Sequence, residues 1–286
     1  MRSCLLAISV GLSITLNFVD AFSQTPTCNN LSAKNNALAK KVFTQTHPYD
    51  CCDDTMAVCL KDRPMCSLVY RLAENICNRV ANGQFDEQIK LWLSRRSRSM
   101  LDSTQSADIY LKEVAMAGQN DAPVEIVEYA CARCPFCATI TPLLYEAISK
   151  GRLKGKAKLY FKNFPINSHK WAKESGLGFV AAARSGKFWP FMINSFQNFE
   201  RFSAKTQLDW AEASGIKGEA FNKLLSDPKT RALLVESKKE GLRNNVTATP
   251  TFFINGRKYE GELKLPEVID VIEEEYERAT GVEHRK

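Results

Sequence analysis

The 286-residue sequence predicts a small α-helical, cysteine-rich region followed by a larger α/β domain. Three observations predict this class. Six of the ten cysteines lie between residues 28 and 77, in a stretch whose apolar residues recur at helical spacing. From residue 107 onward, short apolar runs alternate with longer helical patterns, as is typical of α/β domains. One apolar run leads directly into a Cys-x-x-Cys pair at the start of a predicted helix.

The first 23 residues have the pattern of a secretory signal peptide. Arg2 supplies a positive charge, an apolar run extends from Leu5 to Val19, and Ala21-Phe22-Ser23 offers the small residues of a cleavage site. The apolar run is short for a membrane span and is interrupted by polar residues. We therefore expect a soluble, periplasmic or secreted chain that begins near Gln24. An uncleaved N-terminal anchor is the alternative.

Residues 24–93 are expected to form a helical region held together by disulfides. Cysteines this dense form structural bridges in an exported protein, whereas the same density in a cytosolic protein would favour zinc. The six expected to pair are Cys28, Cys51, Cys52, Cys59, Cys66 and Cys77.

The clearest helix of this region is predicted to run from Pro64 towards Ala81, with Gly83 beyond its end. Cys66 and Cys77 lie about three turns apart on it, so they cannot bond to each other. Adjacent cysteines such as residues 51 and 52 are also expected to have separate partners. Beyond this, the sequence leaves the pairing open.

Residues 94–106 are polar and show no periodicity, so we expect a linker there. Arg95, Arg96 and Arg98 lie in this segment among serines, and a run of this kind is typical of a solvated segment. The formal net charge is +7, but the cations are mixed with acids along the whole chain. This distribution argues against a nucleic-acid partner.

Residues 107–286 are expected to form one domain. Its predicted elements are a strand at 124–129, a helix at 135–150, a strand at 157–164, several helices over 168–245, strands at 251–254 and 257–259, and a helix at 266–279. Asn255-Gly256 marks a hairpin turn between the last two strands. This order of elements is that of a thioredoxin-like fold with a helical insertion.

Cys134 and Cys137 stand where the first of these strands meets its helix. The unpaired N–H groups at a helix start carry partial positive charge and stabilise a thiolate. A thiolate is the nucleophile in disulfide exchange, and its pKa falls at such positions. Two intervening residues allow the second sulfur to reach the first. The pair is therefore a candidate redox site.

Residues 107–286 resemble the DsbA-like branch of the thioredoxin superfamily. Several motifs in family order carry the resemblance. They are Cys134-Pro135-Phe136-Cys137 after a strand that contains Glu128, Lys162-Asn163-Phe164-Pro165 at the next strand end, His169, the run from Ala181 to Trp189, and Thr249-Pro250 followed by Thr251–Gly256. The Cys-rich N-terminal region resembles no family that we recognise.

The resemblance implies a protein thiol–disulfide oxidoreductase that needs no cofactor besides its redox-active disulfide. By this resemblance Cys134 is the exposed attacking thiolate, Cys137 the resolving thiol, and Pro250 a cis-proline that faces them. Thr249 would present its backbone to the substrate. A trans-proline that begins an edge strand is the alternative for Pro250. The residues expected to contact substrate are Pro135, Phe136, Thr249 and Trp189.

Three neighbours of the dithiol are expected to tune it. Relatives carry a buried acid at the position of Glu128, which implies a proton relay to the resolving thiol, with Lys158 or Lys162 as its partner. An acid that faces solvent at the strand end is the alternative. Arg133 is expected to favour the thiolate. Phe136 replaces a histidine common in the best-known oxidants of the family, which implies a less oxidising disulfide.

Cys131 adds a third cysteine at the same spacing. We expect it to be a small buried hydrophobic residue. A third redox-active thiol and a metal ligand in an array with Cys134 and Cys137 are the alternatives.

The sequence thus predicts an exported oxidoreductase that acts on unfolded or cysteine-containing client proteins and exchanges electrons with a membrane redox partner. It leaves open whether the protein is an oxidase or a reductase or isomerase, and it leaves the oligomeric state open. A cysteine-rich metal-binding protein is the alternative of another class.

Overall fold

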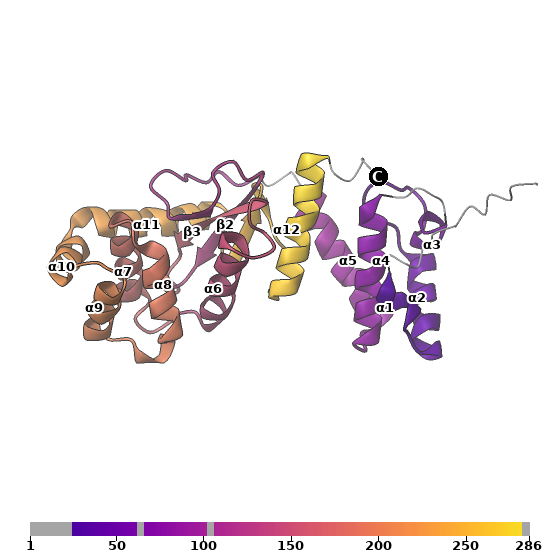
Figure 1. The fold of residues 1–286 in the computed structure, drawn as a ribbon, viewed down its shortest axis with the longest axis horizontal. Helices are drawn as coiled ribbons and strands as arrows, with labels where there is room; N and C mark the ends of the chain where they lie inside the picture. The colour runs from indigo at the N-terminus through magenta and orange to yellow at the C-terminus, as the bar shows by residue number, and fades with distance from the viewer. Residues whose placement is uncertain (1–24, 62–65, 102–105, 282–286) are drawn as a thin grey trace, which may run out of the picture. The chain divides into compact units, whose positions relative to one another are not determined.

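The computed structural model describes residues 25–61, 66–101 and 106–281, so the expected signal peptide (1–23) lies outside the described residues. The chain divides into two compact units, Met1–Ile89 and Lys90–Lys286 (Figure 1). Within the described ranges, no helix combines the length and apolarity that crossing a membrane requires.

The N-terminal unit is helical. Its elements are α1 (Pro26–Asn29), α2 (Ala33–Gln45), α3 (Met56–Cys59), α4 (Ser67–Ala81) and the first residues of α5 (Asp86–Leu101). Helix α4 buries an apolar face against α1 and α2, as its helical periodicity predicts. Helices α2 and α3 begin with side-chain caps. The Ser32 side chain accepts a hydrogen bond from Asn35 N–H, and the Thr55 side chain accepts one from Val58 N–H.

Three disulfides join the helices of this unit. They pair Cys28 with Cys77, Cys51 with Cys66, and Cys52 with Cys59. The predictions that Cys66 and Cys77 bond different partners, and that Cys51 and Cys52 do too, are confirmed. The Cys28–Cys77 bridge ties α1 to α4 across a sequence separation of 49 residues, and Cys52–Cys59 closes a loop with a separation of seven.

Helix α5 corrects the expectation of a linker at 94–106. The segment is helical as far as Leu101, and residues 102–105 lie outside the described residues. Periodicity is hard to see there because the residues that pack inward include polar ones. Arg96 was expected to be solvated, yet only 2% of it is exposed.

The physical reason is an ion pair with the C-terminal helix α12 (Leu265–Thr280). The Arg96 guanidinium donates to Glu274 at 2.6 and 3.0 Å and to Asp270 at 2.5 Å. One helix turn earlier, the indole N–H of Trp92 donates to Glu267 at 3.2 Å. A buried arginine keeps its charge only with such partners, so sequence alone cannot distinguish it from a solvated one.

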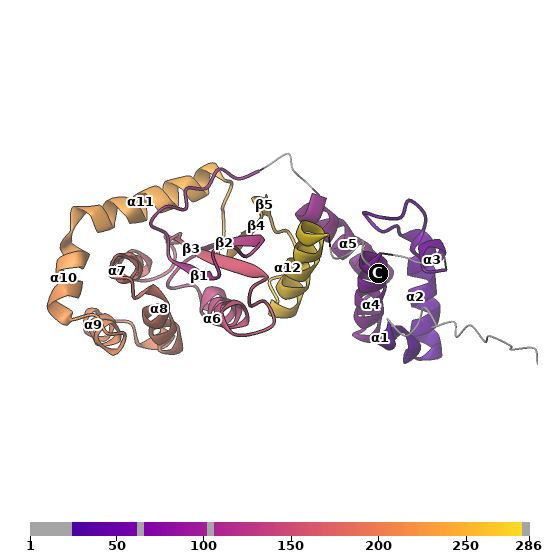
Figure 2. The ribbon, with the colours of Figure 1, turned by 45° about the horizontal axis from the view of Figure 1, so that its top comes forward.

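The second unit is built on a five-stranded sheet of order β1-β3-β2-β4-β5 (Figure 2). The strands are β1 (Met116–Gly118), β2 (Val124–Ala130), β3 (Ala157–Asn163), β4 (Thr251–Ile254) and β5 (Arg257–Lys258). β2 and β3 are parallel, and the other neighbouring pairs are antiparallel. Four strands agree with the predicted ones to within a residue at each end. The edge strand β1 was not predicted, because Met-Ala-Gly has no strand pattern of its own.

The two faces of the sheet are covered by different helices. α6 (Pro135–Ser149) and α12 pack together on one face, and α11 (Pro228–Arg243) packs on β3 from the other. Because side chains alternate along a strand, adjacent residues of β2 face different helices. Glu128 contacts Thr141 of α6, whereas the Tyr129 hydroxyl donates to Glu240 of α11 at 2.5 Å.

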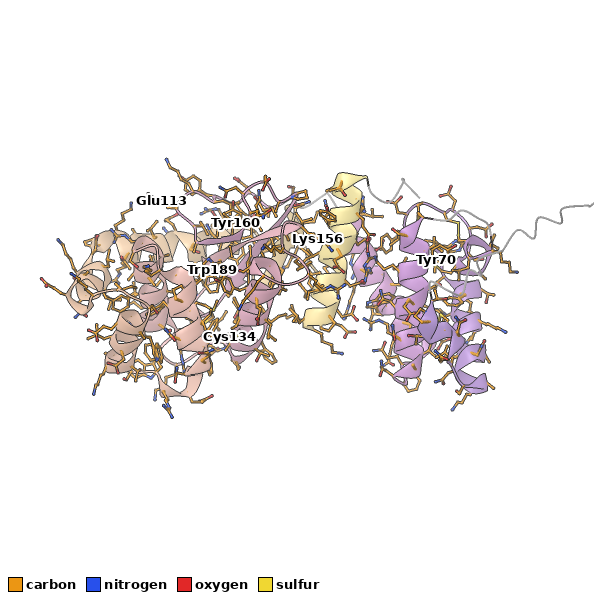
Figure 3. The ribbon with its side chains drawn as sticks, in the orientation of Figure 1. Tyr70, Glu113, Cys134, Lys156, Tyr160 and Trp189 are labelled. Carbon is orange, nitrogen blue, oxygen red and sulfur yellow. A yellow bond between two sulfur atoms is a disulfide. The ribbon has the colours of Figure 1, made fainter. Side chains whose placement is uncertain are left out.

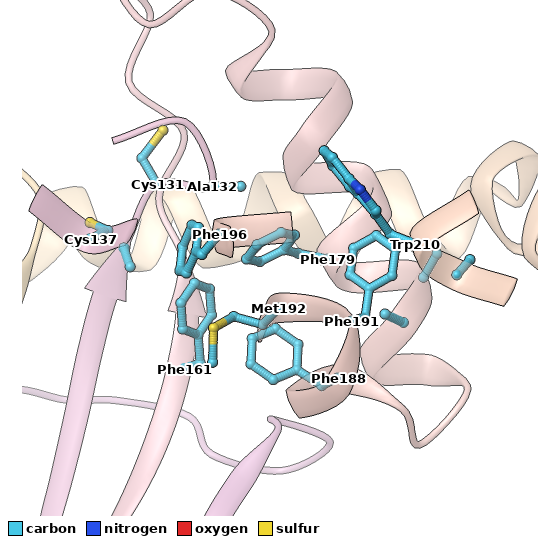
Figure 4. Close-up of a cluster of buried hydrophobic side chains, with 14 of the residues drawn as sticks. Cys131, Ala132, Cys137, Phe161, Phe179, Phe188, Phe191, Met192, Phe196 and Trp210 are labelled. Carbon is cyan, nitrogen blue, oxygen red and sulfur yellow. The ribbon is translucent and has the colours of Figure 1, made fainter. Parts of the chain in front are cut away.

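The predicted helical insertion is present between β3 and β4. It contains α7 (Ala172–Arg184), α8 (Phe188–Gln197), η2 (Phe199–Arg201), α9 (Ala204–Ala213) and α10 (Gly218–Ser226), followed by α11. Its core is aromatic: Phe179 lies within 5.4–5.7 Å, centroid to centroid, of Phe188, Phe191 and Phe196 (Figure 4). The same cluster of buried residues includes Cys131, Cys134 and Cys137. The insertion thus forms an apolar wall beside the dithiol.

Candidate active site

Cys134 occupies the N-cap position of α6, directly after β2 (Figure 3). Pro135 is the first residue of the helix, which suits it because that position needs no N–H donor. The Cys134 thiol donates to the Thr249 carbonyl at 3.3 Å. The Thr249–Pro250 peptide is cis, as the resemblance implied. Two segments more than a hundred residues apart in sequence thus meet at one sulfur.

The surroundings of Cys134 favour its thiolate. A hydrogen bond from Cys137 lowers the pKa of Cys134 most, and Thr249 and the N–H groups of Phe136 and Cys137 lower it further. Burial opposes these effects, but the resulting pKa is about 5, against an ordinary value of 9.0. The Thr249 hydroxyl oxygen has no hydrogen-bond partner among the described residues. Cys134 is therefore mainly a thiolate at neutral pH.

The expectation of an exposed Cys134 is wrong, since only 2% of the residue is exposed. The cause is the Thr249 backbone on one side and the aromatic insertion on the other. The exposed residues are the two that follow it. Pro135 lies at the surface, and Phe136 is 70% exposed. An apolar surface therefore borders the buried sulfur.

Cys137 has the opposite character. It is fully buried, and its pKa lies well above the ordinary thiol value because of burial, the hydrogen bond to Cys134 and the nearby Glu128 carboxyl. The two sulfurs of one motif thus differ sharply in acidity. Such a difference is what a nucleophile and its resolving partner require.

Glu128 is the buried acid that the resemblance implied, not a solvent-facing one. None of it is exposed, and burial raises its pKa from 4.5 to about 8. The Thr141 hydroxyl donates to Oε1 at 2.5 Å, whereas Oε2 has no hydrogen-bond partner in the described part of the chain. Thr141 lies one helical turn after Cys137 on α6. The sequence analysis missed Thr141, although its i+4 spacing from Cys137 was visible.

Neither predicted lysine pairs with Glu128. Lys162 lies 2.8 Å from Glu240 on the opposite face of the sheet, and Lys158 lies 3.8 Å from Glu125. The alternation of a strand explains this result. Lys162 is the register partner of Tyr129 rather than of Glu128, so it shares the face of Tyr129.

Arg133 does not act on Cys134 as expected. Its guanidinium donates to the Phe199 carbonyl and lies over the Phe199 and Phe202 rings, 4.2 and 5.3 Å from their centroids. The contacts that lower the pKa of Cys134 do not include it. Arg133 therefore links the active-site turn to the helical insertion.

Cys131 is fully buried, and burial raises its pKa above the ordinary value. Its sulfur lies 3.4 Å from Nδ1 of His169 and accepts the Arg133 backbone N–H at 3.4 Å. The expectation of a small buried residue is confirmed, but the histidine contact was not predicted. In the described ranges, no group of three His, Cys, Asp or Glu side chains is arranged to hold a metal ion.

Trp189, one of the residues expected to contact substrate, packs against two other elements. Its indole N–H donates to the Met116 carbonyl at 2.8 Å, and its ring stacks on Tyr145 at 4.6 Å. Tyr145 is eight residues beyond Cys137 in α6, which corresponds to about 12 Å along the helix. These contacts make Trp189 a packing residue between α6, α8 and β1.

Comparison with known proteins agrees with this geometry. The family model described as thioredoxin matches residues 112–274, which is more than half of the chain. The crystal structure of oxidised BdbD from Bacillus subtilis superposes with a TM-score of 0.51 at 23% identity, covering 60% of this chain and 97% of that one. This likeness establishes the fold. The chain belongs to the thioredoxin family.

Two relatives illustrate the similarity in sequence. The probable disulfide bond formation protein D of Bacillus cereus is 28% identical over 155 residues, covering 49% of this chain and 68% of that protein. The Na(+)/H(+) antiporter NhaA 3 of Salinispora tropica is 25% identical over 178 residues, or 60% of this chain. The chain spans about a quarter of the length of that antiporter and of similar ones.

Proposed function

We propose that this protein is an exported thiol–disulfide oxidoreductase that exchanges disulfides with client proteins through Cys134 and Cys137. The observation that best supports this proposal concerns two thiols at the start of one helix. The pKa of Cys134 is lowered, and the pKa of Cys137 is raised. Perturbed pKa values of opposite sign within hydrogen-bonding reach are typical of catalytic pairs. The similarity to a probable disulfide bond formation protein supports the same reading.

In the oxidising direction, a client thiolate attacks the Cys134 sulfur of the Cys134–Cys137 disulfide. The Cys134–Cys137 bond breaks, and Cys137 leaves as a thiolate that takes up a proton. A second client thiolate then attacks the client sulfur of the mixed disulfide, and Cys134 leaves as a thiolate. The client loses two electrons, and the enzyme gains them. The reverse sequence reduces a client disulfide, and Cys137 then resolves the mixed disulfide.

Glu128 is the proposed proton carrier for Cys137. A thiol with a raised pKa must give up its proton before it can attack the mixed disulfide. The Glu128 carboxyl, whose pKa is about 8, takes protons up and releases them near neutral pH. Thr141 holds one carboxyl oxygen and leaves the other available.

Client contact is assigned to the exposed Pro135 and Phe136 and to the backbone of Thr249. Two apolar side chains beside the sulfur suit an unfolded segment with apolar residues around its cysteine. Export is supported by the signal-like first 23 residues and by the three N-terminal disulfides, which require an oxidising compartment. The cycle then needs a second partner that accepts or supplies electrons, and a membrane redox protein is the proposed one.

The acidity of Cys134 indicates how strongly oxidising the Cys134–Cys137 disulfide is. The nucleophilic cysteine of thioredoxin has a pKa near 7, and its disulfide has a reduction potential of about −270 mV. The corresponding cysteine of DsbA has a pKa of about 3.5, and its disulfide has a reduction potential of about −120 mV. A pKa of about 5 lies between them. We expect a potential between those of thioredoxin and DsbA, a range that includes protein disulfide isomerase.

The test is the equilibrium potential of the Cys134–Cys137 pair in glutathione buffers, together with exchange of the full chain with a reduced, unfolded client. A value near −120 mV would make the protein a disulfide donor, and one of about −200 to −270 mV a reductant. A value below about −300 mV, typical of structural bridges, would contradict the proposed function. Exchange no faster than with glutathione alone would also contradict it.

A further inference from the structure

A cleft of about 540 Å³ is lined by the β3–α7 connection, the first half of α7 and α11. Helices α7 and α11, whose places in the fold are seen in Figures 1 and 2, pack against each other. None of the roles proposed above uses this cleft. Its walls come from residues 165–174, Leu177 and the middle of α11, and their charge is strongly one-sided. The charged residues that line it are Lys170, Lys173, Glu174, Arg231, Lys238 and Lys239.

Part of this positive charge has no partner among the residues that the structure describes. Lys239 pairs with Glu236 at 3.2 Å, and Lys238 donates to the Pro165 carbonyl at 2.9 Å. Lys173 and Arg231 form neither an ion pair nor a side-chain hydrogen bond with any residue that the structure describes. Both lie at the surface, on opposite walls of the cleft. An anionic ligand would therefore be attracted from two sides.

The floor of the cleft is apolar. Ile166, Leu177 and Leu234 line it, and Trp171 stands at its edge with 47% of its surface exposed. Phosphate sites are built instead from converging backbone N–H groups or from arginine forks. Here the cations are spread along the rim, and only one of them is an arginine. The arrangement fits a longer ligand that carries both carboxylates and an apolar side chain.

The cleft is connected to the redox site by two contacts. His169 lines the cleft, and its Nδ1 lies 3.4 Å from the Cys131 sulfur. The Cys131 carbonyl in turn accepts the Cys134 backbone N–H at 3.0 Å. His169 and Cys131 therefore link one wall of the cleft to the turn that carries Cys134.

We propose that this cleft binds an acidic peptide segment that flanks the reactive cysteine of a client or redox partner. Carboxylates of the segment contact Lys173 and Arg231, and one aliphatic or aromatic side chain covers Leu234 beside Trp171. The inference rests on the proposed function, because it names the class of protein that Cys134 acts on. It adds a recognition site separate from the apolar surface at Phe136.

The test uses the full chain and a charge-reversed variant, Lys173→Glu with Arg231→Glu. The matched control is Lys205→Glu with Lys217→Glu, two exposed lysines elsewhere in the insertion whose reversal changes the net charge by the same amount. Binding of a labelled peptide rich in glutamate, with a leucine and without cysteine, is measured by fluorescence anisotropy. We expect the cleft variant to bind about tenfold or more weakly, the control to bind normally, and binding to weaken with salt.

A kinetic measurement links binding to exchange. Rates are compared for an acidic and an uncharged peptide, each carrying the same disulfide. The ratio of the acidic rate to the uncharged rate should fall about tenfold in the cleft variant and stay constant in the control. An unchanged ratio and affinity would overturn the proposal. So would equal affinity for inorganic phosphate, for anionic vesicles or for single-stranded DNA, each of which would indicate a different ligand.

The two proposals fail in different ways. If neither peptide disulfide is exchanged by any form of the protein, the proposed redox function fails, while the anisotropy result still tests the cleft. If the uncharged peptide is exchanged normally and the acidic peptide shows no preference for the wild type, only the cleft proposal fails.

Discussion

The two units of this protein use the same side chain in opposite ways. In the N-terminal unit, each of the six cysteines that the structure describes bonds a partner in another element or loop, so the three bridges hold separate segments together. In the C-terminal unit, three free cysteines lie within seven residues around the start of one helix. A bond between Cys134 and Cys137 constrains nothing that the helix has not already fixed. It can therefore open and close while the fold stays the same.

The largest test of this comparison removes one sulfur from each unit. Replacing Cys134 by serine should lower the rate of disulfide exchange by about 10³-fold or more, because serine cannot form the mixed disulfide. Cys52→Ser, measured per folded molecule, should leave that rate within about twofold, although the yield of exported protein falls. Exchange kinetics with a small disulfide substrate decide this. A comparable rate loss in both variants would mean that the N-terminal bridges relay electrons.

The second test measures how far a bridge in the N-terminal unit stabilises it. Removing Cys28 and Cys77 together should lower the free energy of unfolding of this unit by about 4 kcal/mol, since the bridge closes a separation of 49 residues. Removing Cys52 and Cys59 should cost about 2 kcal/mol, because the loop is much shorter. Urea unfolding of the full chain, followed by probes in each unit, gives both values. Equal costs would refute the loop-length argument.

A third test separates the free thiols by pH. After mild reduction that leaves the N-terminal bridges intact, alkylation of Cys134 should follow a titration with its midpoint near pH 5. Cys131 and Cys137 should react only far above it, since the pKa of each is raised by burial. Mass spectrometry of peptides alkylated over a range of pH measures all three. A Cys134 midpoint near 9 would remove the basis for its role as nucleophile.

The smallest expected effects come from Glu128. The variant Glu128→Gln should slow resolution of the mixed disulfide about tenfold or more and remove a step near pH 8 from its pH profile. Gln keeps the shape and the hydrogen bond from Thr141, so a loss of rate is not a packing effect. Thr141→Val is the matched variant that tests the positioning of the carboxyl. A pH profile identical to wild type would exclude the relay.

The raised pKa of Glu128 also makes the free energy of unfolding depend on pH. A raised carboxyl pKa stabilises the fold below about pH 4.5, and this stability is lost as pH rises through about 8. The depressed pKa of Cys134 acts oppositely: the reduced form is stabilised above pH 9, and this is lost as pH falls through about 5. Unfolding of reduced Glu128→Gln should therefore show stability that rises with pH, and that of Cys134→Ser stability that falls.

The sequence was sufficient where a local pattern decides the structure. Four of the five strands, the α6 start and the Asn255-Gly256 turn follow from apolar periodicity, proline and glycine, and both turn residues have the expected positive φ. The dithiol and the cis-proline follow from a resemblance carried by several motifs. The buried Glu128 could be expected for the same reason, because its strand was correctly placed.

The sequence was insufficient where two distant segments determine the environment of one residue. Arg96 is buried only because α12 brings Glu274 to it, and Cys134 is covered only because the Thr249 segment crosses it. Arg133 is near the nucleophile in sequence, yet the aromatic rings of the insertion draw it elsewhere. Trp189 is likewise placed by Met116 in an edge strand that has no sequence signal.

The ion pair of α5 with α12 bears on how this protein can be divided by genetic engineering or by gene fusion in evolution. The family match begins at residue 112, beyond α5, and ends at residue 274 within α12. A gene fragment cut at those limits would encode the sheet and the dithiol but would discard Arg96. The fragment would also end inside α12, so it would lose the Arg96–Glu274 ion pair, which is buried in the whole chain, and removing one partner of a buried pair is strongly destabilising. A fragment that keeps this ion pair must therefore be longer than the matched family domain, and it must begin within α5 or before it.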